Sequence, residues 1–249
     1  MQRASSSCYC AIVAVALGLT TGCDDLPGEP EISAFAADPA LVQKAESKAS
    51  GSQIPFANLK LFFEFNSTDN DLGVQLLLDG DEWERVEAFD PGKRKILDIA
   101  VHGRLGELGL TELFFESAEP SPAEVLALFP AGTYRFEGRT LEKDKLVGTA
   151  TLSHNLPPAP SFSPSNGESV NRNNTIIQWN PIPGIVAFQV IVENETLGVV
   201  MTVDVKPPVT SLQVPPTFMQ PNTEYKAEIL AIGANGNRTI AEGKFVTLP

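Results

Sequence analysis

Apolar and polar residues alternate along much of the chain after residue 53. In Leu59–Phe65, every second residue from Leu59 is apolar, and Lys60 and Glu64 lie between them. A period of two places alternate side chains on one face of a β-strand. Further strands are expected at Val74–Leu78, Glu82–Phe89, Lys93–Val101, Thr111–Ser117, Thr133–Leu141 and Lys145–His154. The pattern therefore predicts a mostly antiparallel β-domain over residues 54–155.

Turn and helix signals lie between these strands. Asp90-Pro91-Gly92 predicts a turn, because proline presets φ and glycine accepts positive φ. Ser121 is typical of a helix N-cap, Pro122 is typical of the first helical position, and Glu124 is spaced to close a capping box. These signals predict one short helix that ends near Phe129.

A proline-rich segment separates this domain from the rest of the chain. Residues 155–165 contain four prolines, and segments of this kind are semi-rigid spacers. Beyond them, short strands recur with turn residues between them, which is typical of a β-sandwich. The expected strands are Thr175–Trp179, Val186–Glu193, Val199–Val205, Ser211–Val214, Glu224–Ala231 and Thr239–Thr247. We therefore expect an all-β fold whose second domain covers residues 156–249.

Several short segments of the second domain resemble a fibronectin type III domain. Ile177–Pro181 resembles the family's second strand, with a core tryptophan at its centre. Phe188–Val192 stands where the family often has a Tyr-x-Val-x-Val strand, although its first residue is not tyrosine. Leu212 and Asn222–Tyr225 resemble the leucine and the tyrosine corner of later strands, and Asn235–Asn237 fits the last turn. The resemblance implies that the tryptophan and the tyrosine belong to the core.

This resemblance covers residues 157–249 and contains no Arg-Gly-Asp sequence, so it does not imply integrin-type adhesion. The first domain is similar, over Phe62–Trp83, Gly106–Pro120 and Gly132–Thr140, to an uncharacterised group of secreted bacterial proteins. That second resemblance implies an architecture, in which such a domain precedes a fibronectin-like one. It implies no activity.

Residues 1–22 have the layout of an export signal. Arg3 is the charged side chain before the apolar run Cys8–Leu19, and small residues follow that run. The run is shorter than the ~20 residues that comfortably span a membrane. Leu19–Cys23 resembles the lipobox of bacterial lipoproteins, although Thr20 stands where that family's pattern has leucine. The sequence therefore predicts a lipoprotein signal peptide.

Cys23 is the cysteine that remains once this signal is removed. Cys8 and Cys10 lie inside the signal, and exported proteins normally pair their cysteines. Lipidation explains the isolation of Cys23. We therefore expect a lipid anchor in a membrane of the cell envelope, on its periplasmic or cell-surface side. A secretory signal followed by a free thiol, and an uncleaved anchor, remain as alternatives.

The composition narrows the classes of partner. Residues 23–53 contain few large apolar side chains and predict a flexible tether after the lipidated cysteine. The formal net charge of −13 argues against nucleic acid as a partner, because phosphates require clustered Lys and Arg. The same charge is compatible with an attraction for cations.

One acidic segment has the spacing of a cation-binding loop. Asp69, Asp71 and Gly73 form Asp-x-Asp-x-Gly, in which alternate carboxylates converge and glycine permits a bend. The hypothesis is a weak calcium site with Asn66, or Asp81 from a second acidic loop one strand away, as an extra ligand. The alternative is that these residues form a turn and nothing more.

Aromatic and acidic residues suggest two further kinds of site. Trp83 follows an acidic loop, so it is either a core residue or an exposed platform for binding a sugar ligand. Paired carboxylates are the groups that hydrolyse glycosides. The candidate strand residues for such a pair are Glu64, Glu82, Glu84, Glu112 and Glu116.

Motifs of catalysis are absent from the sequence. It contains no Gly-x-Ser-x-Gly elbow, and its two histidines, His102 and His154, are not spaced as a zinc motif. We therefore expect no catalysis, but a lipid-anchored extracytoplasmic protein that presents its β-domains to a polysaccharide or an envelope protein. Two alternatives remain open: a calcium-dependent carbohydrate-active enzyme, and a structural subunit of an envelope complex.

The lipidation hypothesis predicts the behaviour of one variant. Cys23→Ser should release the protein from membranes or stall its processing, because the lipid has no other attachment point. Membrane fractionation and the electrophoretic migration of the precursor and mature forms measure this. A variant that fractionates and migrates like the wild type would contradict the hypothesis.

Overall fold

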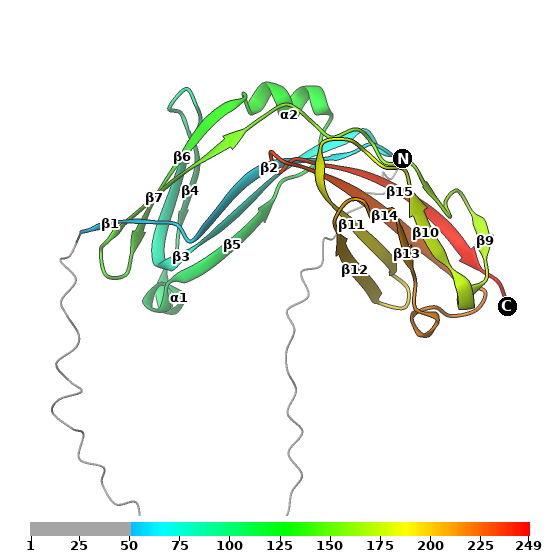
Figure 1. Ribbon diagram of the computed structural model, residues 1–249. Helices are drawn as coiled ribbons and strands as arrows, with labels where there is room; N and C mark the ends of the chain where they lie inside the picture. Colours follow the sequence, from blue (N-terminus) through cyan, green and yellow to red (C-terminus); the bar gives the residue numbers. More distant parts are fainter. Residues whose placement is uncertain (1–50) are drawn as a thin grey trace, which may run out of the picture. The chain divides into compact units, whose positions relative to one another are not determined.

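A single long strand, β3 (Asp71–Phe89), organises the first half of the chain in the computed structural model (Figure 1). The structure describes residues 51–249. The expectations for the export signal, for Cys23 and for most of the tether therefore lie outside the described residues. Within residues 51–249, none of the helices is both long enough and apolar enough to span a membrane.

Strand β3 belongs to two groups of strands. Residues 71–79 pair with β2 on one side and residues 75–79 pair with β5 on the other, while residues 85–89 pair with β4 and β6. β7 then pairs with β6, and β1 adds to β7 in parallel. The other strands of this N-terminal module, residues 53–152, are β1 (Gln53–Pro55), β2 (Asn58–Asn66), β4 (Lys95–Ala100), β5 (Leu110–Glu116), β6 (Gly132–Thr140) and β7 (Lys145–Leu152).

The structure corrects the expectation of two strands and an acidic loop in this region. Asp79–Glu82 does not form a loop but lies within β3, at the shift in register between its two sets of partners. Gly80 is buried there, and a Cβ atom would lie 3.4 Å from Leu146 and 3.5 Å from Phe56. The glycine therefore allows close packing rather than a turn, and strand partners on both sides keep β3 continuous.

Two short helices accompany the strands. The expected helix is present as α2 (Pro122–Leu128), and the Glu124 carboxylate accepts hydrogen bonds from the backbone N–H and the hydroxyl of Ser121. A second helix, α1 (Gly103–Leu108), was not expected, because its sequence is rich in glycine.

Alternate side chains of both strand groups form one apolar core. Phe63, Leu78, Trp83, Tyr134 and Phe136 are fully buried in it. Trp83 is therefore a core residue. Its ring is not exposed at the surface, so it does not form the sugar-binding platform considered from the sequence.

The C-terminal module, residues 162–247, is a sandwich of two sheets. One sheet has the order β8-β10-β13, and the other has the order β12-β11-β14-β15, with β9 beside β15. The six strands expected here are all present, and β8 and β9 are additional. The strands are β8 (Phe162–Ser163), β9 (Glu168–Val170), β10 (Ile176–Trp179), β11 (Ile185–Asn194), β12 (Val199–Val205), β13 (Ser211–Gln213), β14 (Glu224–Gly233) and β15 (Arg238–Thr247).

Two residues of the fibronectin type III resemblance occupy the expected positions. Trp179 is 3% exposed and packs against Phe188, with ring centroids 5.5 Å apart. The hydroxyl of Tyr225 accepts a hydrogen bond from the N–H of Gln220 and donates one to the carbonyl of Phe218. This is the geometry of a tyrosine corner, so the expected β-sandwich is confirmed.

The two modules are connected by strand pairing. Residues 238–240 of β15 pair in parallel with residues 64–66 of β2. Beside this pairing, Asn237 is 1% exposed, and its Oδ1 accepts a hydrogen bond from the N–H of Phe63. Its Nδ2 donates to the carbonyls of Ser153 and Asn155, where the linker begins. We call the β2–β15 pairing and the Asn237 contacts the joint.

The joint predicts the effect of Asn237→Ala. The change leaves the N–H of Phe63 without its buried acceptor, so the free energy of unfolding should fall by about 1–3 kcal/mol. Hydrogen exchange should accelerate at the amides of Phe63 and Ser67, while the amide of Val190 in β11 stays protected. Asn174→Ala, at an exposed asparagine, is the control. Equal exchange in wild type and Asn237→Ala would contradict this account of the joint.

Candidate functional site

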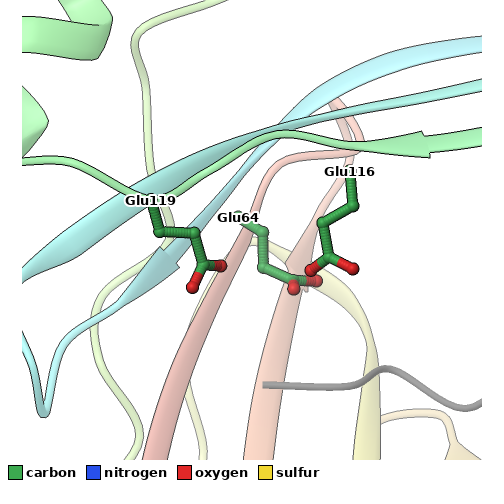
Figure 2. Close-up of side chains that lie close together, drawn as sticks. All are labelled: Glu64, Glu116 and Glu119. Atoms are coloured by element: carbon green, nitrogen blue, oxygen red, sulfur yellow. The ribbon is translucent and has the colours of Figure 1, made fainter. Parts of the chain in front are cut away.

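Three glutamates converge where β2, β3 and β5 lie side by side (Figure 2). Glu64 lies on β2, Glu116 is the last residue of β5, and Glu119 lies in the segment between β5 and α2. One carboxylate oxygen from each lies within 4.8 Å of the other two. We call these three residues the glutamate cluster.

The strand register explains the convergence. Glu64 is opposite Gly73 on β3, and Glu116 is opposite Gln75 two residues further along. Gly73 has no side chain, and a Cβ atom there would lie 3.2 Å from Cγ of Glu119. The glycine therefore leaves the space that Glu119 occupies.

Gln75 lies in the middle of the cluster and is fully buried. Its Nε2 donates hydrogen bonds to Oε1 of Glu64 at 2.8 Å and to Oε1 of Glu116 at 3.1 Å. Its own Oε1 is buried and has no hydrogen-bond partner. The amide thus links two carboxylates while leaving one of its own acceptors unsatisfied.

Burial of the carboxylates raises their pKa values. It raises the pKa of Glu64 to about 7, and the Arg238 guanidinium opposes this increase. The pKa of Glu119 also rises to about 7, first through burial and then through the negative charges of Asp71 and Glu116. The pKa of Glu116 is raised by burial as well. The cluster therefore binds protons more tightly than isolated glutamates do.

Arg238 connects the cluster to the joint. Its Nη1 lies 3.4 Å from Oε2 of Glu64, and its guanidinium lies over the ring of Phe62, 4.5 Å from the centroid. Phe62 and Phe63 are both buried although they point to opposite faces of β2. Arg238 covers the Phe62 face of the strand.

The residues of the expected calcium loop form a turn that contacts β15. Oδ1 of Asn66 accepts hydrogen bonds from the backbone N–H groups of Thr68 and Asp69, and its Nδ2 contacts Oε1 of Glu242 at 3.2 Å. The bend is made by Asn70, whose φ is 58°. The expectation that Gly73 makes the bend is wrong. With the Asn66 oxygen engaged in the turn, a calcium site at Asp69 and Asp71 stays a prediction.

Asp81 does not belong with these residues. It lies ten positions beyond Asp71 on the same strand, and a strand rises ~3.3 Å per residue, so about 30 Å of strand separates them. This length of strand argues against an ion shared by Asp81 and the turn, and the second acidic loop expected from the sequence is part of β3.

The sequence predicts only some residues of the glutamate cluster. Glu64 and Glu116 were among five strand glutamates considered as carboxylate pairs, and the structure brings those two together. Glu119 was missed because it lies outside a strand, and Gln75 was missed because it looks like an ordinary strand residue. The register that places Gln75 opposite Glu116 was the missing information.

Similarity to known proteins is found among solved structures. No family model matches the chain, and no curated protein matches it. Among solved structures, the chain is similar to the FN1–FN3 domains of chicken CNTN1, with 11% identity, a TM-score of 0.35 and coverage of 80% of this chain and 66% of that one. It therefore spans just under two thirds of the CNTN1 structure.

Two further structures are similar at the same level. The fibronectin(III)-like modules of Clostridium thermocellum CbhA share 8% identity, with a TM-score of 0.31 and coverage of 82% of this chain and 92% of that one. The two-domain fibronectin type III segment of chicken tenascin shares 12% identity, with a TM-score of 0.30 and coverage of 75% and 96% respectively. The fold is shown by the strand pairing described above.

The raised pKa of Glu64 predicts how stability depends on pH. The folded state binds this proton more tightly than the unfolded state, whose pKa is near 4.5. Stability from this group is therefore present at low pH and is lost as the pH rises towards about 7. Urea unfolding with a chelator present, at pH 5 and at pH 8, should show a smaller loss in Glu64→Gln than in wild type. Glu112→Gln, on β5, should match wild type, and an identical pH response in Glu64→Gln would contradict the assignment.

Proposed function

We propose that the protein is a lipid-anchored, extracytoplasmic, non-catalytic binding or spacer protein. The joint is the observation that carries this proposal. A spacer must hold its two ends in a fixed arrangement. Here β2 pairs in parallel with β15 beside the buried Asn237 side chain, so hydrogen bonds of the backbone connect the two modules. A flexible linker alone would not do this.

The contacts of the linker support the same role. Oγ1 of Thr239 donates a hydrogen bond to the carbonyl of Pro157, and Nδ2 of Asn235 donates one to the carbonyl of Asn155. The proline-rich segment that follows the N-terminal module is therefore bound to the C-terminal module at its start. Proline also restricts the backbone of this segment.

The environment of the glutamate cluster favours binding over glycoside hydrolysis. Glu64 is only 4% exposed, and both Glu64 and Glu116 share the amide of Gln75. A glycosidase needs its two carboxyl groups on either side of an accessible scissile bond. Carboxylates that share one buried amide are poorly placed for that chemistry.

The proposal includes a lipid anchor and a partner in the cell envelope. The signal-like start of the sequence and the isolated Cys23 support a lipid anchor in the cell envelope, followed by a tether. The modules would then be held at a distance from the membrane and presented to an envelope polysaccharide or protein. The rival function is a calcium-dependent carbohydrate-active enzyme, for which the glutamate cluster would be the site.

One experiment separates these functions. The purified full chain is incubated with isolated cell-envelope polysaccharide and calcium chloride, and both co-sedimentation and the release of reducing ends are measured. We expect co-sedimentation without reducing ends, and the same result for Glu64→Gln/Glu116→Gln. Reducing ends that the wild type releases and this double variant does not would overturn the proposal in favour of the enzyme.

A further inference from the structure

The glutamate cluster has a surplus of hydrogen-bond acceptors. Oε1 of Gln75 and Oδ1 of Asp71 are both buried without a partner, and both accept hydrogen bonds but cannot donate them, whereas one donor near Glu64, Nε of Arg238, is buried without a partner. Gln75 is fully buried, and its amide lies between the carboxylates of Glu64 and Glu116. An unsatisfied buried acceptor is costly, and a positively charged group would satisfy it.

The surrounding charges reinforce this surplus. Glu119 experiences the negative charges of Asp71, Glu116, Asp69 and Glu242. On the positive side, Arg238 contacts Glu64 at 3.4 Å. Lys226 lies on β14, the strand that pairs with β15. Its Nζ contacts carboxylates of Glu193, Glu228 and Glu242. The described basic groups therefore balance only part of the local negative charge.

We propose that Glu64, Glu116 and Glu119 bind one hard divalent cation, calcium. Nε2 of Gln75 faces two of these carboxylates, so its amide would turn over on binding to bring the amide oxygen to the ion as a further ligand. The donors are all oxygens, which such cations prefer. Two oxygens on opposite sides of a calcium ion lie about 4.6–5.2 Å apart, since each Ca–O distance is about 2.3–2.6 Å. The cluster oxygens lie within 4.8 Å of one another, so each is at most about 2.8 Å from a central point, and side-chain shifts of about 0.2 Å bring all three within reach of one ion.

The site differs from the calcium loop expected from the sequence. That loop used neighbouring residues of the β2–β3 turn, whereas these ligands come from β2, β3, and β5 with the segment after it. The cation would connect the end of β5 to β2, the strand that pairs with β15 at the joint. Calcium would therefore stabilise the N-terminal module next to its connection with the C-terminal one.

Calorimetric titration of the full chain with calcium chloride, after removal of bound metal with a chelator, tests the proposal. We expect one saturable site, and an affinity reduced about tenfold or more in Glu116→Gln and in Glu119→Gln, because each loses one charged ligand. Glu112→Gln removes the same charge from β5 four residues away and should bind like wild type. Circular dichroism of each variant establishes that it is folded.

A second variant should increase the stabilisation by calcium instead of reducing it. Gln75→Glu adds a fourth carboxylate at a fully buried position, so its thermal midpoint should fall below that of wild type in chelator and recover with calcium chloride by a larger shift than wild type shows. If the cluster bound protons but no cation, calcium chloride would not restore the thermal midpoint of this variant.

Three outcomes would overturn the assignment. The first is the absence of saturable calcium binding by the wild type. The second is a loss of binding in Asp69→Asn while Glu116→Gln binds normally, which would place the ion in the β2–β3 turn. The third is magnesium chloride binding as tightly as calcium chloride, which would remove calcium as the preferred ion.

Discussion

The buried side chain of Asn237 is the contact on which the arrangement of the described chain depends. One amide accepts from the backbone of β2 and donates to two carbonyls where the linker begins. The bond to the N–H of Phe63 satisfies a buried backbone group, and the bonds to the carbonyls of Ser153 and Asn155 hold the start of the linker. A purely apolar contact could slide, whereas these directional bonds fix which residues of β2 and β15 meet. The parallel pairing of residues 64–66 with residues 238–240 follows from that register.

The glutamate cluster lies beside this contact for a geometric reason. Glu64 is opposite Arg238 in the same pairing, so the joint brings a positive side chain to one side of the cluster. The other side is formed by Glu116 and Glu119, which β3 and its glycine hold in place. Burying several carboxylates near one arginine costs free energy unless further positive charge arrives. This cost is the physical reason to look for a cation at this position.

Local signals predicted most of the fold, because the residues involved act on their immediate neighbours. The alternation in β2, the cap at Ser121 and the tyrosine corner at Tyr225 each require only a few adjacent positions, and the structure contains all three. Gly80 predicts a turn from the sequence, because a glycine beside acidic residues usually indicates one, but it lies inside β3. Its true role depends on Phe56 and Leu146, which are distant in sequence.

The candidate site was less accessible than the fold, since it depends on pairing between distant segments. Nothing in the local sequence around Gln75 indicates that its amide will lie between Glu64 and Glu116. The acidic turn at Asp69 has a recognisable spacing, whereas the glutamate cluster has none. Its members become neighbours only when β2 and β5 lie on either side of β3.

The pairing of β2 with β15 also has a consequence for the order of events during synthesis. Phe63 and Asn237 are 174 positions apart, so β2 is made long before its partner. Until then, the N-terminal module exposes an open strand edge, which is a template for aggregation. Strand β15, the last of the described strands, covers residues 64–66 of that edge. A ribosome that stalls before residue 238 would therefore leave an unprotected β-edge on a module that is otherwise complete.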